Sequence, residues 1–110
     1  MSPEVDADDG ALGAEAALRW RIPPGQRFLF EDFDDGIVMF DALVGSTHLV
    51  SVTAAETLAV IEAEPGLTAG AVYERLLARI EATEAALPFA AVRELLWQLE
   101  NLNLVAATTR

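Results

Sequence analysis

The sequence predicts an α+β domain with a winged-helix-like arrangement, in which a three-stranded antiparallel sheet is followed by three helices. Two observations lead to this prediction. Runs rich in aromatic and β-branched residues come first, and turn signals separate them. Segments with apolar residues spaced three and four apart follow, separated by Pro and Gly. Strands and helices that are segregated along the chain in this way are typical of the α+β class.

The predicted sheet rests on two turns. Apolar runs flank Asp35-Gly36, which is a strong hairpin signal because type I′ turns need residues that tolerate positive φ. A second turn at Gly45-Ser46 leads into another β-branched run. Three sequential strands would therefore form a meander. The expected strands are 27–33, 37–43 and 47–52, preceded by a separate short strand within 18–22 that contains Trp20.

Three helices are expected after the sheet. Thr53-Ala54-Ala55-Glu56 has capping-box spacing and starts the first helix, which Pro65-Gly66 ends. Thr68 is the expected N-cap of the second helix, and Pro88 opens the third. Asn101 and Asn103 are suitable C-terminal caps of the third helix. The expected buried faces are Val72, Leu76, Leu77 or Tyr73, and Ile80 in the second helix, and Val92, Leu95, Leu96, Leu99 and Leu102 in the third.

The composition indicates one acidic domain. A chain of 110 residues has room for a single core, and residues 1–17, with five acids and no aromatic residue, predict a disordered acidic tail before a folded domain over 18–106. The net charge of −11, with seven Arg and no Lys, argues against nucleic acid as a partner. No apolar run approaches a membrane span, so we expect no membrane partner. The absence of cysteine fits a cytoplasmic location.

Catalytic and metal-binding patterns are weak. His48 is the single histidine; Ser46 lies two residues before it, but the nucleophile elbow of a hydrolase is missing. The acids around the first hairpin do not form a calcium loop, because Leu43 stands where the closing Glu would be, eleven residues after Asp32. We therefore expect no enzyme and no catalytic, cofactor or metal site.

Two features point instead to binding. The last strand of the meander, 47–52, has one free edge and carries no Pro, Lys or charge to guard it at neutral pH, so it could accept an extended peptide as another strand. Homodimerisation through the same edge, or its coverage by the N-terminal segment, are the alternatives. Trp97 and Arg93 lie off the main apolar stripe of the third helix and are residue types that anchor interfaces. The alternative is that Trp97 packs at the edge of the core.

The chain resembles a known family in several short motifs. The run from Thr47 to Leu58, THLVSVTAAETL, resembles the strand-to-helix junction of PqqD-like peptide chaperones. Gly45 to Leu49, the Trp20 segment and Val38-x-Phe40 are similar to the PqqD branch named for the HPr-rel-A system. The family often ends in a Leu-Gly-Leu-Val-type sequence, and Asn103 replaces the Gly here. The resemblance covers about residues 18–106.

This resemblance implies a RiPP recognition element, a small winged-helix module that binds the leader of a ribosomally made precursor peptide and presents it to a peptide-modifying enzyme. It implies that the leader adds as a strand to the edge of the third strand and lies in a cleft toward the third helix. A winged-helix DNA-binding regulator and a dimerising structural interaction subunit remain the alternatives. Carried over by position, the peptide-binding residues are Thr47, His48, Leu49, Val50, Ser51 and Val52 on one side, and Arg93, Leu96, Trp97 and Glu100 on the other.

Overall fold

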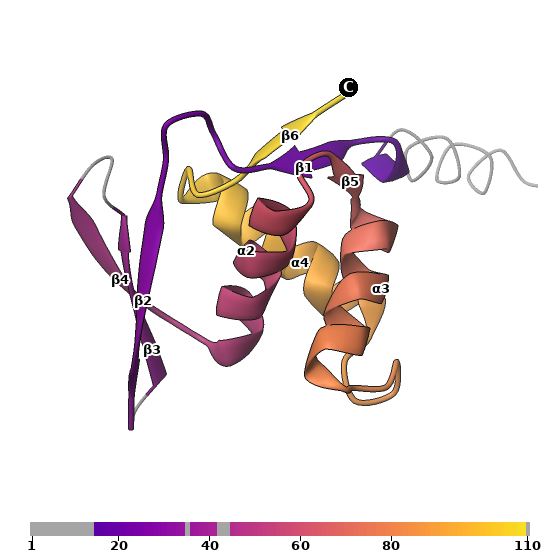
Figure 1. The fold of residues 1–110 in the computed structure, drawn as a ribbon. Helices are drawn as coiled ribbons and strands as arrows, with labels where there is room; N and C mark the ends of the chain where they lie inside the picture. Colours follow the sequence, from indigo (N-terminus) through magenta and orange to yellow (C-terminus); the bar gives the residue numbers. More distant parts are fainter. Residues whose placement is uncertain (1–14, 35, 42–44, 110) are drawn as a thin grey trace, which may run out of the picture.

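The computed structural model describes residues 15–34, 36–41 and 45–109. Within them the chain forms an α+β fold of two three-stranded antiparallel sheets and three helices (Figure 1). The predicted class is confirmed. The elements are β1 (Arg19–Arg21), β2 (Phe28–Phe33), β3 (Gly36–Asp41), β4 (Ser46–Val50), α2 (Val52–Ala63), β5 (Leu67–Thr68), α3 (Ala69–Ile80), α4 (Phe89–Asn101) and β6 (Ala106–Thr108).

The predicted meander is present as the sheet β2-β3-β4. Phe33 pairs with Gly36, so the predicted hairpin is present, but Gly36 is the first residue of β3 and not a residue of the turn as predicted. Gly36 has a φ of 144°, a conformation that glycine adopts at no steric cost. Residues 42–44, which include the last two residues of the predicted second strand, and Asp35 lie outside the described residues. The third strand ends at Val50, two residues earlier than predicted.

A second small sheet, in the order β5-β1-β6, was not predicted. The expected short strand around Trp20 exists as β1, and it is the central strand. Its partners have only two and three residues, and they come from the connection before α3 and from the segment after α4. Strands this short carry too little alternation to be recognised in a sequence. The sheet closes the domain by bringing both ends of the described chain together (Figure 1).

The helices occur where they were predicted, with one corrected start. Thr53 is not the N-cap of α2; Ser51 is, because its hydroxyl accepts a hydrogen bond from Ala54 N at 3.0 Å. Thr68 caps α3 as expected, and Pro88 precedes the first turn of α4. None of the described helices is long and apolar enough to cross a membrane.

The C-terminus of α4 is a Schellman motif. Leu104 N donates to Leu99 O at 3.0 Å, and Asn103 N donates to Glu100 O at 2.9 Å. Asn103 adopts a φ of 62°, the left-handed conformation that its sequence position predicted. Leu99 and Leu104 are both buried, which adds the hydrophobic contact that accompanies this motif. The motif turns the chain back from α4 toward β6.

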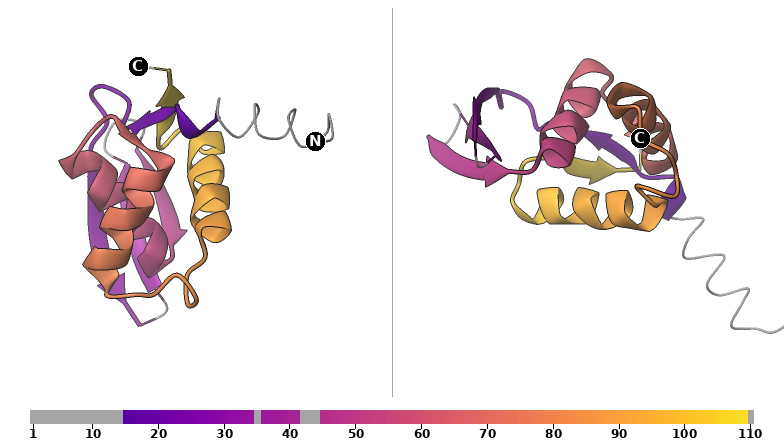
Figure 2. Two further views of the ribbon diagram at one scale, coloured as in Figure 1. Left: turned by 90° about the vertical axis from the view of Figure 1, so that its right-hand side faces the viewer. Right: turned by 90° about the horizontal axis from the view of Figure 1, so that it is seen from below.

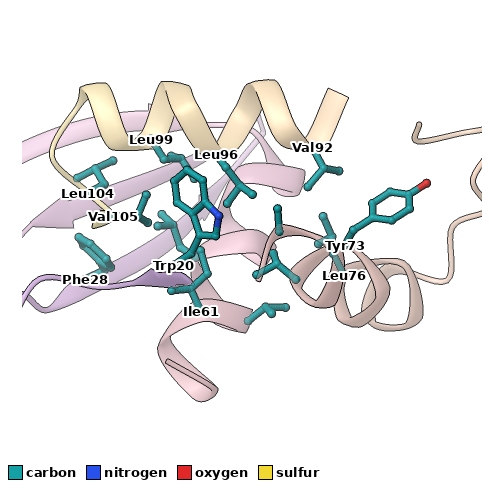
Figure 3. Packing of buried hydrophobic residues seen from close by; sticks show 14 of the residues in the cluster. Trp20, Phe28, Ile61, Tyr73, Leu76, Val92, Leu96, Leu99, Leu104 and Val105 are labelled. Carbon is teal, nitrogen blue, oxygen red and sulfur yellow. The ribbon is translucent and has the colours of Figure 1, made fainter. Parts of the chain in front are cut away.

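The core lies between the helices and the two sheets, and Trp20 is at its centre. Figure 3 shows the indole beneath α4, close to Leu96, Leu99 and Val105. Its Nε1 is buried without a hydrogen-bond partner among the described residues. The β2-β3-β4 sheet stands at one end of the helical part of the domain. Within that helical part, α4 lies on one side and the α2–α3 pair on the other (Figure 2, right). This arrangement leaves one face of that sheet toward the helices and the other toward solvent.

Candidate functional site

β4 is a terminal strand of its sheet. Among the described strands it pairs with β3 alone, in the register Ile37–Val50 to Asp41–Ser46. Its side chains alternate: Ser46, His48 and Val50 are half-buried on the inner face, whereas the side chains between them are exposed. An edge of this kind presents backbone N–H and C=O groups that can hydrogen-bond to another extended chain.

A groove runs between β4 and α4. It has a volume of about 190 Å³ and is bounded by the end of β4, the start of α2 and one flank of α4. Most of its lining is apolar, because leucines project into it from both sides. Leu102 is 52% exposed here, and it was wrongly expected to be buried in the core. The lining residues are Leu49, Val50, Ser51, Ala54, Leu95, Gln98, Leu99 and Leu102.

A second, more polar cavity of about 480 Å³ lies at the other end of β4, and Leu102 borders both. Asp41 lies in its wall with 2% of its surface exposed. Gln26 Nε2 donates to the Asp41 carboxylate at 2.6 Å and approaches Asn103 O at 3.2 Å. This cavity also brings Ser46 and His48 to the same wall as Asp41. The Gln26–Asp41 contact could not be predicted from local patterns, since Gln26 precedes β2 and Asp41 ends β3.

The helix side of the groove differs from the set carried over from the family resemblance. In an α-helix successive residues turn by about 100°, and Leu95, Gln98 and Leu102 therefore share the flank that borders β4. Arg93, Trp97 and Glu100 lie toward the opposite flank, and none of them lines the groove. Leu96 is fully buried in the core between the two flanks. The structure thus brings the predicted strand next to α4 but turns the predicted helix residues away from it.

The far flank of α4 is occupied by contacts within the chain. Arg93 makes a bidentate ion pair with Glu15, in which Arg93 Nη2 lies 2.8 Å from Glu15 Oε1. The hydrogen bond from Arg93 lowers the pKa of Glu15, although partial burial opposes this shift. Glu15 belongs to the segment expected to be a tail, of which residues 1–14 lie outside the described residues.

Trp97 packs against the core edge, as the alternative interpretation had it. Its ring stands edge-on to Trp20 with the ring centroids 5.0 Å apart. This T-shaped geometry is the one aromatic pairs prefer. Trp97 therefore stabilises the junction between α4 and β1.

The strand side agrees more closely with the expected residues. Leu49, Val50 and Ser51 line the groove, and His48 lines the neighbouring polar cavity. Thr47 points to the outer face of the sheet, since it is paired with the exposed Phe40. Val52 is the first residue of α2 and is exposed.

In the part of the chain that the structure describes, no three His, Cys, Asp or Glu side chains are grouped closely enough to hold a metal ion. Comparisons of the chain with protein-family models, with curated proteins and with solved structures find no significant match. The resemblance to PqqD-like proteins therefore stays a prediction from the sequence motifs.

Proposed function

We propose that this protein is a non-catalytic peptide-binding chaperone that takes up an extended peptide as a fourth strand beside β4. The observation that supports this most directly is the apolar groove between β4 and α4, which lies beside the strand edge at which another chain can pair. Backbone hydrogen bonds to an edge strand supply affinity, and a groove for every second side chain supplies specificity. Both parts are present at this one edge.

The groove favours a peptide with aliphatic side chains. Leu95, Leu99 and Leu102 line the helix side of the groove, and burying such surfaces is the main favourable term in association. The net charge of −11 favours a peptide that also carries Lys or Arg.

In its cellular setting we propose that this peptide is the leader of a ribosomally made precursor, presented to a peptide-modifying enzyme in the cytoplasm. The support is the sequence resemblance to PqqD-like chaperones together with the groove beside β4. The resemblance suggests the source of the peptide, and the groove suggests how it would be held.

A pair of matched substitutions tests the binding mode. Leu102 and Leu29 are 52% and 55% exposed, and Leu29 lies on the outer face of the sheet, away from the groove. We expect Leu102→Asp to weaken binding of the cognate leader about tenfold or more, because it places a charge in an apolar contact. Leu29→Asp changes net charge equally and should leave leader affinity unchanged. Isothermal titration calorimetry with the purified full chain measures both.

Amide chemical shifts give the location independently. Adding the leader should shift the amides of 46–51 and of 95–102 in the ¹⁵N spectrum. Shifts confined to the far flank of α4, or equal loss of affinity in the two variants, would show that the peptide does not bind in this groove.

A further inference from the structure

The outer face of the β2-β3-β4 sheet carries a continuous apolar surface. In an antiparallel sheet, residues paired across strands point to the same face. The pairs Leu29–Phe40 and Val38–Leu49 therefore share one face with Phe33, which pairs with Gly36. We call this set the outer apolar face: Leu29, Phe33, Val38, Phe40 and Leu49.

These side chains are open to solvent. Phe33 is 60% exposed and Leu49 is 68% exposed, while the inner-face residue Met39 is fully buried. The Leu49 Cδ1 lies 3.5 Å from where a Cβ on Gly36 would be, so this leucine covers the glycine and extends the apolar surface toward the hairpin. A solvated sheet face normally carries polar residues. Contiguous exposed apolar surface on a small domain marks an interaction site.

The outer apolar face carries the acid Glu31, and the exposed Arg27 lies directly before β2. Glu31 lies on the face itself, because it pairs with Val38. Residues 28–50 contain four further acids and no Arg or Lys, although Asp32 and Asp41 lie on the inner face, and the whole chain carries a net charge of −11. A partner that complements this surface therefore has apolar side chains bordered by Lys or Arg.

The same charges argue against occupants from this chain. Two copies docked face to face would bring two Glu31 carboxylates into one interface, and each copy carries a net charge of −11. Residues 1–14 contain four acids and no basic residue, so charge repels them from this face as well. Like charges placed opposite one another cost free energy in a sheet and at an interface.

We infer that the outer apolar face docks a second protein that presents an apolar patch bordered by Lys or Arg. This site meets the peptide groove at Leu49, which also lines the groove, while its other members lie on the face of the sheet that points away from the helices. The inference does not depend on what fills the groove.

Site-specific photocrosslinking tests the inference in the full chain. Phe33→p-benzoylphenylalanine places the crosslinker on the outer apolar face, and the same substitution at the exposed Glu62 of α2 is the control. In cells of the native host, Phe33 should crosslink to a different protein, at a segment where apolar residues are flanked by Lys or Arg. The control position should not.

Capture alone does not support the inference, so affinity is measured with the captured protein after purification. Leu29→Asp and Glu31→Arg should each weaken binding about tenfold or more, the second by reversing the complementary charge. Glu62→Arg makes the same charge change on α2, and Leu102→Asp alters the groove; neither should affect this affinity. Leu29→Asp should weaken binding of the captured protein and leave leader affinity unchanged, whereas Leu102→Asp should do the opposite. The two variants therefore distinguish this site from the peptide groove.

Several results would overturn the inference. One is a crosslink from position 33 to a second copy of the chain, to residues 1–14, or to lipid. Another is crosslinking at position 33 that does not exceed crosslinking at the control position. A captured protein whose affinity is the same for Leu29→Asp, Glu31→Arg and the unchanged chain would overturn it equally.

Discussion

At the scale of single residues, Glu15 shows how a contact with a residue far away in the sequence changes the pKa of a carboxyl group. The bidentate bond from Arg93 lowers the pKa of Glu15. Because this pKa is lower in the folded chain than in the unfolded one, the ion pair contributes stability at neutral pH. That contribution is lost as the pH falls below the usual range of Glu, about 4.3, and through the lowered pKa.

We therefore expect the Glu15 carboxyl to titrate below its ordinary range, and Arg93→Ala to return it toward that range. Carbon-13 NMR of the glutamate side chains follows the titration directly. Arg75→Ala removes an exposed ion pair with Glu64 and serves as the control, because it should leave Glu15 unaffected. An ordinary pKa for Glu15 in the unchanged chain would show that the ion pair does not persist in solution.

Asp41 is the second residue whose role depends on a distant partner. It is a nearly fully buried carboxylate and accepts a hydrogen bond from Gln26 at 2.6 Å. Gln26→Ala should lower the free energy of unfolding by about 1–3 kcal/mol, since it removes a donor from a buried charged acceptor. Gln98→Ala, at an exposed position, should change it by less than about 0.5 kcal/mol. Urea denaturation compares the two, and equal effects would contradict this role for Gln26.

At the scale of elements, the end of α4 depends on one left-handed residue. Asn103 has a φ of 62°, and its backbone N donates one of the two hydrogen bonds of the Schellman motif, to Glu100 O. Asn103→Val should lower the free energy of unfolding by about 1–2 kcal/mol, because a β-branched residue is strained in this conformation. Asn103→Gly should preserve or raise stability. Thermal unfolding distinguishes them, and equal midpoints for the two variants would show that this conformation is not retained.

The elements that the sequence predicted well are those with strong local signals. The hairpin between β2 and β3, the cap at Thr68 and the left-handed Asn103 each follow from the preferences of the residues themselves, although the turn precedes Gly36 and does not include it. By contrast, β5 and β6 are held by pairing with β1 rather than by their own residues. Their existence depends on the tertiary fold, which local reasoning does not contain.

One side of the candidate site could also be predicted from local signals, and the other could not. The edge strand could be predicted, because a meander leaves its last strand with one neighbour. The helix side of the groove could not be predicted. The spacing of apolar residues in α4 shows which residues face the core, but it does not show which flank of the helix turns toward β4. The structure places Leu95 and Leu102 there, and it turns Trp97 onto Trp20 instead.

At the scale of the whole molecule, the sheet β2-β3-β4 separates two surfaces of different character. The end of its edge strand, at Leu49 and Val50, borders the groove with α4, and its outer face is apolar and carries Glu31. A small domain that binds a peptide on one side of a sheet leaves the other side accessible to a second protein. The net charge of −11 acts on both, since it attracts basic groups from any direction.

This charge leads to a prediction about association rate. A leader peptide containing Lys or Arg should associate about tenfold or more faster at low salt than at about 0.5 M salt, because screening shortens the range of attraction. The dissociation rate should change much less, since it reflects the short-range contacts in the groove. Stopped-flow fluorescence with a labelled peptide measures both rates. The same peptide with its basic residues replaced by Gln is the control and should associate at a rate nearly independent of salt. If the basic and Gln peptides show the same salt dependence, the negative field of the domain does not steer the encounter.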